Sequence, residues 1–156
     1  MEKLERMNIL LVGNNPIELS TVDNSIEGFG RGLLKTTFIF DLKSITQSIK
    51  RLNPAGIFID DNLNIKEIKK TIFKLHRNKN TSHIPVTLIK SSNFTSYPNL
   101  GADDFILNTN ISGKGIYKSV ANGAKFRKSS IFLKKAYRKQ QGKFAKLQTS
   151  LSMLFY

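Results

Sequence analysis

The chain has 156 residues, the length of one domain with an appendage, and a formal net charge of +14. It contains no cysteine, which excludes disulfides, thiol nucleophiles and thiolate metal sites. No apolar run reaches the roughly 18 residues of a membrane span, and the acidic Glu2 and Glu5 are unlike a signal peptide, so we expect a cytoplasmic protein.

The positive charge is concentrated in residues 123–156. This segment holds nine of the 25 Lys and Arg residues and none of the 11 Asp and Glu residues. A long segment of one sign indicates either an acidic or polyanionic partner or a solubilising surface helix. The composition leaves both alternatives open.

Apolar strand patterns and helical patterns alternate along the first half of the chain. A buried strand is predicted over 8–12, and Asn15 is suited to cap a helix that begins at Pro16. A second strand over 36–40 is rich in β-branched and aromatic residues, and a helix over 43–52 follows it.

The second half of the chain continues the alternation. The pattern predicts, in order, a strand over 56–60, a helix over 64–77, a strand over 86–90, an irregular segment over 91–100, a strand over 104–107 and a helix over 112–125. Such alternation is typical of right-handed crossovers around a parallel sheet. We therefore predict an α/β fold with five parallel strands in the order 2-1-3-4-5 and helices on both faces.

Asp60 ends the third predicted strand, directly after three apolar residues. Ligands and chemistry in open α/β sheets usually lie at the carboxyl edge of the strands. Asp60 is therefore the first candidate for a functional residue.

Three segments, in order and at family spacing, resemble the receiver domain of bacterial two-component response regulators. They are Gly101-Ala102-Asp103-Asp104-Phe105-Ile106, Ile84-Pro85-Val86, and Pro54 followed by Ile57-Phe58-Ile59-Asp60-Asp61-Asn62-Leu63. The resemblance covers roughly residues 7–124 and implies a flavodoxin-like receiver domain. Residues 125–156 would then form a basic, amphipathic helical extension.

The resemblance places Asp60 at the phosphorylated aspartate of the family. Receivers hold Mg²⁺ with this residue and an acidic pair after the first strand, and they add a hydroxyl group and a lysine that stabilise the phosphoryl charge. Here the acidic pair aligns with Gly13 and Asn14, the hydroxyl position with Lys90, the lysine position with Asn108, and the aromatic switch position with Phe105.

These replacements predict a pseudo-receiver with no efficient phosphotransfer. We expect a non-enzymatic signalling or adaptor module that needs no cofactor and binds an unidentified protein partner, with an acidic partner as one candidate. One alternative is a working receiver phosphorylated at Asp60, with a relocated Mg²⁺ site that uses Asp61. Another is nonspecific binding of nucleic acid or an anionic membrane through the basic tail.

Two expectations concern the neighbourhood of the fourth strand. The ammonium group of Lys90 could pair with Asp60 and lock one conformation, or it could extend to solvent. Only 11 residues separate Lys90 from Gly101, so the fourth helix of the family is expected to be shortened or absent. The signalling face that this helix forms in the family would then be rebuilt.

The basic tail carries an apolar seam with heptad spacing. The seam positions are Phe126, Ser130, Leu133, Tyr137, Gln140, Phe144, Leu147, Leu151 and Leu154. Basic residues flank it and are candidate contacts for an anion or a partner: Lys134, Lys135, Arg138, Lys139, Lys143 and Lys146. Ser129 or Ser130 could cap a new helix here. The leading expectation is that the seam packs on the protein's own body; pairing with another helix and binding to an anionic surface are the alternatives.

Overall fold

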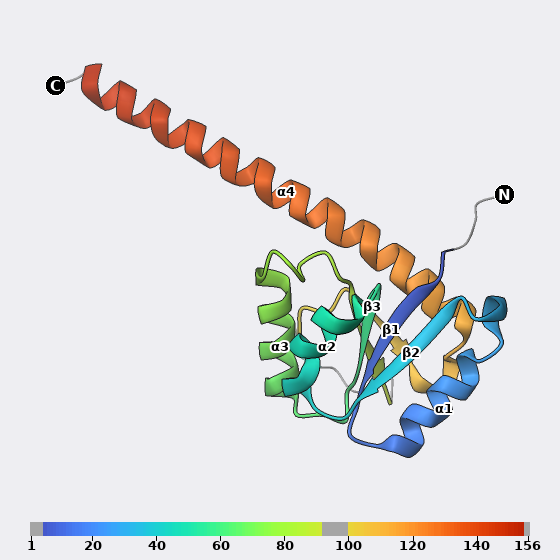
Figure 1. Cartoon of the computed structure of the whole chain (residues 1–156). Coiled ribbons are helices and arrows are strands. Elements are labelled where there is room, and N and C mark those ends of the chain that lie inside the picture. The colour runs from blue at the N-terminus through green and yellow to red at the C-terminus, as the bar shows by residue number, and fades with distance from the viewer. Residues whose placement is uncertain (1–4, 92–99, 155–156) are drawn as a thin grey trace.

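The computed structural model describes residues 5–91 and 100–154 (Figure 1). Its strands are β1 (Met7–Val12), β2 (Leu34–Ile39), β3 (Gly56–Asp60), β4 (Val86–Lys90) and β5 (Asp104–Leu107). Its α-helices are α1 (Pro16–Ile26), α2 (Ile45–Leu52), α3 (Ile65–Arg77) and α4 (Gly113–Leu154). Short 3-10 turns occupy Phe29–Arg31, Leu42–Ser44 and Asn108–Asn110.

The five strands form one parallel sheet in the order β2-β1-β3-β4-β5, which confirms the predicted fold class. The predicted limits of β3, β4 and β5 match the structure residue for residue. Helix α2 begins two residues later than predicted. Asp41 explains this difference, because its carboxylate accepts a 2.8 Å hydrogen bond from the Ser44 N–H and starts a 3-10 turn first.

Helices cover both faces of the sheet (Figure 1). On one face, α2 and α3 pack through residues such as Ile49, Ile68 and Ile72 against alternate side chains of the strands. On the other face, α1 packs through Leu19 and Val22, and α4 packs through Ile116 and Val120. Because strand side chains alternate between faces, each strand contributes to both cores.

Asparagine side chains set the start of two helices. The Asn15 side chain accepts hydrogen bonds from the N–H groups of Ile17 and Glu18, at 3.0 and 3.4 Å, as predicted. The Asn64 side chain caps α3 in the same way. Each cap satisfies N–H groups that have no partner within the helix and contributes about 1 kcal/mol.

Helix α4 is one unbroken helix of 42 residues, so the prediction that Ser129 or Ser130 caps a new helix is wrong. Glycine allows its first part to lie close to the sheet. A Cβ atom at Gly123 would lie 2.6 Å from the Cβ atom of Pro85, which is too close for any other residue. Gly123, which weakens the helical pattern in the sequence, therefore allows close packing and does not break the helix.

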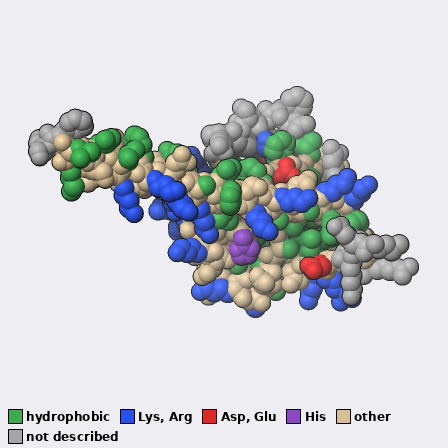
Figure 2. All heavy atoms as spheres, turned by 90° about the horizontal axis from the view of Figure 1, so that it is seen from above, with side chains coloured by type: hydrophobic (Ala, Val, Ile, Leu, Met, Phe, Trp, Pro, Cys, Tyr) green, Lys and Arg blue, Asp and Glu red, His purple; other side chains and the backbone are tan. Residues whose placement is uncertain are grey.

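The distal part of α4 leaves the body of the protein (Figures 1 and 2). Every residue from Phe132 to Leu154 is exposed, and Tyr137 and Phe144 are 65% and 61% exposed. The expectation that the seam packs on the protein's own body is therefore wrong. The physical reason is the direction of α4, which continues straight past the edge of the sheet instead of turning back at a new cap.

The expected loss of the fourth family helix concerns residues 92–99, which lie outside the described residues. Within the described residues, none of the helices has the length and apolar character needed to cross a membrane.

Candidate functional site

Asp60 lies where the sequence predicts, at the carboxyl edge of the central strand. All five residues of β3 are buried, and Asp60 is only 7% exposed. Its carboxylate oxygen Oδ1 accepts a 3.0 Å hydrogen bond from the Asn62 N–H. The neighbouring Asp61 is also buried and accepts a 3.3 Å hydrogen bond from the N–H of Ser91, so its side chain is directed toward the end of β4.

Glu18 joins this site from the first turn of α1. Its carboxylate oxygen Oε2 accepts a 2.8 Å hydrogen bond from the side-chain amide of Asn62. The Glu18 carboxyl group also interacts with Asp60 and disfavours the ionised form of Asp60. The sequence pattern does not single out Glu18, because its position follows only from the docking angle of α1.

The surroundings of Asp60 favour its protonated form. Its pKa is raised from 3.8 to about 6, chiefly by burial, and the neighbouring carboxyl groups of Glu18 and Asp61 also raise it. The hydrogen bond from the Asn62 N–H acts in the opposite direction and lowers the pKa. The crowding of carboxyl groups therefore makes Asp60 a weaker acid than an ordinary aspartate.

Neither a protein-family model nor a curated protein matches the sequence. Solved structures do match the fold. The bacteriophytochrome response regulator AtBRR is 19% identical, with a TM-score of 0.59 over 76% of this chain and 93% of that chain. A signal receiver domain from Clostridium thermocellum is 20% identical, with a TM-score of 0.56 over 76% and 98%.

A third match is the receiver domain of a sensor histidine kinase from Pseudomonas aeruginosa, which holds a magnesium ion in its active-site cleft. It is 14% identical, with a TM-score of 0.61 over 77% of this chain and 98% of that chain. This chain has the fold of a response regulator receiver domain. Each match spans 93–98% of the receiver domain that it is compared with, but about a quarter of this chain lies outside the matched region.

The receiver position of the acidic pair is occupied by Gly13 and Asn14. Gly13 is buried, and a Cβ atom there would lie 3.2 Å from the Cβ atom of Asp60 and 3.1 Å from a methyl carbon of Leu19. Asn14 is exposed. A side chain at position 13 would therefore require Leu19 and Asp60 to shift by a few tenths of an ångström.

These residues do not fit the Mg²⁺ ion that the receiver fold implies. Mg²⁺ requires ionised or strongly polar oxygen ligands in near-octahedral geometry. Here Asp60 is a buried carboxyl group with a raised pKa, while the Asp61 side chain is directed to the end of β4. Over residues 5–91 and 100–154, no group of three or more acidic, histidine or cysteine side chains is placed to hold a metal.

The pairing of Lys90 with Asp60 is not formed. The Lys90 ammonium lies over the ring of Phe105, 4.6 Å from its centroid, and no lysine contributes to the pKa of Asp60. Register explains this arrangement, because Lys90 aligns with Leu107 on β5 and Phe105 lies two residues earlier on the same strand. A cation over an aromatic face is attracted by the ring electrons.

The remaining receiver positions add no cation to the site. Phe105 is 56% exposed on β5. Asn108, which aligns with the receiver lysine in the sequence, is exposed and begins the 3-10 turn after β5. Its neutral amide supplies no positive charge. The structure brings Asp60 together with Gly13, and within residues 5–91 and 100–154 no Lys or Arg side chain pairs with Asp60.

The basic residues of the tail lie far from Asp60. Helix α4 reaches the amino edge of the sheet, where Gly123 meets Pro85 at the entrance to β4, and its distal part continues from there. The exposed cations on this part are Lys134, Lys135, Arg138, Lys139, Lys143 and Lys146. They form a surface separate from the Asp60 site.

A second buried aspartate anchors α4. The Asp103 side chain is 1% exposed, accepts a 2.8 Å hydrogen bond from the Val86 N–H, and lies 3.3 Å from the His76 ring and 3.8 Å from the Arg127 guanidinium. Arg127 also donates a 2.8 Å hydrogen bond to the carbonyl of Ser82. Sequence reasoning missed this cluster, although an arginine at a helix position that faces the sheet is a usable signal.

Proposed function

We propose that this protein is a non-enzymatic, phosphorylation-independent signalling or adaptor module that acts by binding a protein partner. The receiver fold supplies a rigid α/β platform. The Asp60 site, in contrast, lacks the groups that would make the platform respond to a phosphoryl group.

The observation that carries this proposal is the surroundings of Asp60, which among the described residues hold carboxyl groups and no paired cation. A carboxylate can attack phosphorus only when it is ionised, and the developing negative charge must be neutralised by fixed cations. Asp60 is buried with a pKa raised to about 6, and its neighbours are carboxyl groups. Gly13, Asn14 and Asn108 offer neither a metal ligand pair nor a lysine.

The experiment is incubation with acetyl phosphate and Mg²⁺ followed by intact mass measurement. We expect no stoichiometric phosphoryl adduct on the native chain, and a spectrum that matches that of the Asp60→Ala variant. An acid-labile adduct that is present on the native chain and absent from Asp60→Ala would contradict the proposal. It would support the alternative of a working receiver.

A second candidate function is binding of an anionic membrane or nucleic acid by the tail. The observation that favours it is the complete exposure of residues 132–154, which carry both apolar and basic side chains. Removing residues 132–156 keeps the Arg127 anchor and tests this directly. Retention on anionic vesicles or heparin that disappears in this truncated chain would support the candidate, whereas unchanged retention would exclude it.

A further inference from the structure

Helix α3 carries a second stripe beside the one that faces the core. Lys66, Lys69, Phe73 and Arg77 follow one another at intervals of three and four residues, and Lys70 lies next to them. Such spacing places side chains on one face of a helix. The stripe therefore presents one aromatic ring surrounded by cations.

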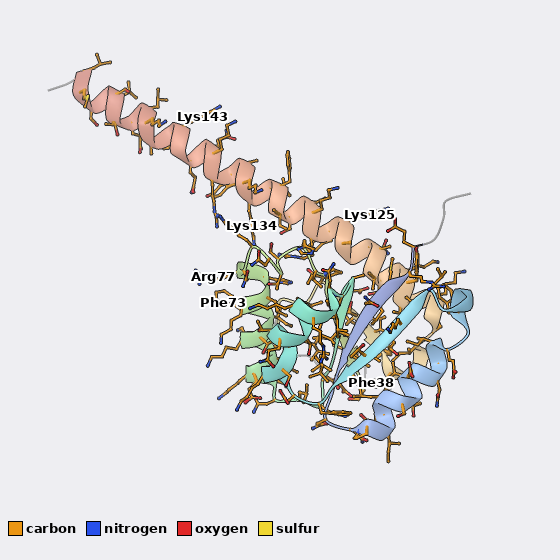
Figure 3. The ribbon with its side chains drawn as sticks, in the orientation of Figure 1. Phe38, Phe73, Arg77, Lys125, Lys134 and Lys143 are labelled. Carbon is orange, nitrogen blue, oxygen red and sulfur yellow. The ribbon has the colours of Figure 1, made fainter. Side chains whose placement is uncertain are left out.

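The distal part of α4 faces this stripe. Lys134 extends from α4 toward the end of α3 that carries Phe73 and Arg77 (Figure 3). The two helices line a groove of about 740 Å³, although Lys134 lies 57 residues beyond Arg77 in the sequence. Lys134 forms the α4 side of the groove, and the other lining residues lie on α3 or at Leu100 and Gly101.

The floor of the groove is apolar. Ile72 and Leu100 contribute buried side chains, and Phe73 contributes a ring that is 58% exposed. The Arg77 guanidinium lies 5.2 Å from the centroid of the Phe73 ring, which holds the cation at the rim. A large exposed ring in a concave site is typical of an anchor for a partner's apolar side chain.

The rim of the groove is strongly basic. Lys66, Lys69, Lys70, Arg77 and Lys134 line it, against the single carboxylate of Glu67. The nearby His76 is already directed to Asp103. The side chains that line the groove therefore carry four more positive than negative charges. The positive potential that they create attracts and orients an anionic ligand.

We propose that the α3–α4 groove is the docking site for an acidic, amphipathic segment of a protein partner. Its apolar side chains would rest on Phe73 and its carboxylates would pair with the rim cations. This inference rests on the proposed function as a protein-binding module. A flat bilayer would not reach the floor of a concave groove, and a nucleic-acid backbone would use the cations without needing the apolar floor.

The test uses the full chain and a synthetic helical peptide with leucine at i, i+3, i+4 and i+7 and glutamate at the other positions. A polyglutamate peptide of equal charge, vesicles containing phosphatidylserine, and duplex DNA are the comparators. Binding is measured by fluorescence anisotropy for the peptides and DNA, and by sedimentation for the vesicles. We expect the amphipathic peptide to bind more tightly than polyglutamate.

Two groove variants and two matched controls locate the binding. Lys70→Glu with Lys134→Glu reverses one cation on each wall, and Phe73→Ser removes the anchor; each should weaken peptide binding about tenfold or more. The controls are Lys50→Glu with Lys118→Glu, which makes the same change in charge outside the groove, and Phe40→Ser, which removes another exposed ring. All six residues are exposed, and the controls should bind within about twofold of the native chain.

Three results would overturn the proposal. Equal binding of polyglutamate would show that charge alone attracts the ligand. Equal losses in the control and groove variants would show that the groove is not the site. Strong binding of vesicles or DNA without binding of the peptide would assign the basic surface to that other partner. Since phosphoryl labelling of Asp60 is measured separately, these failures remain distinguishable from failure of the proposed function.

Discussion

Two aspartates with buried side chains lie at opposite edges of the same sheet, and their surroundings differ in charge. Asp60, at the carboxyl edge, lies beside Glu18 and Asp61 and has a raised pKa. Asp103, at the amino edge, contacts Arg127 and His76. Ionisation of a buried carboxyl group is costly without a nearby cation, and the sheet supplies that cation only at the amino edge among the described residues.

The difference teaches which aspartate stabilises the fold. The receiver resemblance draws attention to Asp60, whose burial disfavours its charge. The cluster around Asp103 instead connects α3, β4 and α4, and it sets the direction in which α4 leaves the body. The functional surface proposed for the α3–α4 groove therefore depends on Asp103 rather than on Asp60.

Removal of the cation at the amino edge should have the largest effect. Arg127→Ala would leave the buried Asp103 without its arginine partner and would remove the hydrogen bond to the Ser82 carbonyl. We expect the free energy of unfolding to fall by about 3 kcal/mol, because an uncompensated buried charge is costly. Urea unfolding measures this change.

Lys128→Ala is the matched control, since Lys128 is the exposed neighbour of Arg127 on the same helix. It should change the free energy of unfolding by no more than about 0.5 kcal/mol. If the two variants are equally stable, the Asp103 cluster does not anchor α4, and the comparison between the two aspartates is wrong.

Replacement of the Asp60 carboxyl group, at the carboxyl edge of the sheet, should raise the free energy of unfolding instead of lowering it. Because the pKa of Asp60 is raised from 3.8 to about 6 on folding, this group makes the protein less stable as pH rises through that window. Asp60→Asn removes the effect, so we expect a gain of about 1–2 kcal/mol at neutral pH after allowance for solvent screening.

The measurement is urea unfolding of the native chain and of Asp60→Asn across the same pH window. The two curves should converge at the acidic end and separate toward neutral pH. Glu27→Gln, at an exposed carboxylate at the end of α1, should not alter the curve. A loss of stability in Asp60→Asn at neutral pH would mean that the ionised form of Asp60 is the stabilising one.

The smallest effect is expected at Lys90. Since its ammonium lies over Phe105, Lys90→Met should leave the titration of Asp60 unchanged. Carboxyl-carbon NMR on the native chain and the variant compares the two midpoints directly. A higher midpoint in Lys90→Met would reveal a favourable charge interaction between Lys90 and Asp60 that the structure does not show.

The strands of the sheet could be predicted because each one is marked by residues that are adjacent in the sequence. The strands β3, β4 and β5 are short apolar runs bounded by polar residues or turns, and the asparagine caps stand next to the helices that they start. Asp60 could be placed for the same reason, since it ends such a run. The contacts between side chains of distant elements could not be predicted in this way, because no local pattern specifies them.

Glu18, Arg127 and Lys90 illustrate what the sequence could not predict. Glu18 reaches Asp60 through the docking angle of α1, and Arg127 meets Asp103 because α4 is unbroken. Lys90 could have turned to Asp60, and only the register of β4 with β5 favours Phe105. The apolar seam of α4 has clear periodicity, but periodicity does not specify what covers a helix face.

The central claim is that burial and neighbouring carboxyl groups disfavour the charge of Asp60, and that neither a metal nor a fixed cation balances it. The most direct measurement is the NMR titration of its carboxyl carbon with and without millimolar Mg²⁺. The account predicts a midpoint near 6 that Mg²⁺ does not move. A midpoint that Mg²⁺ lowers toward the ordinary range of an aspartate would contradict it, because the ion would then bind the ionised carboxylate.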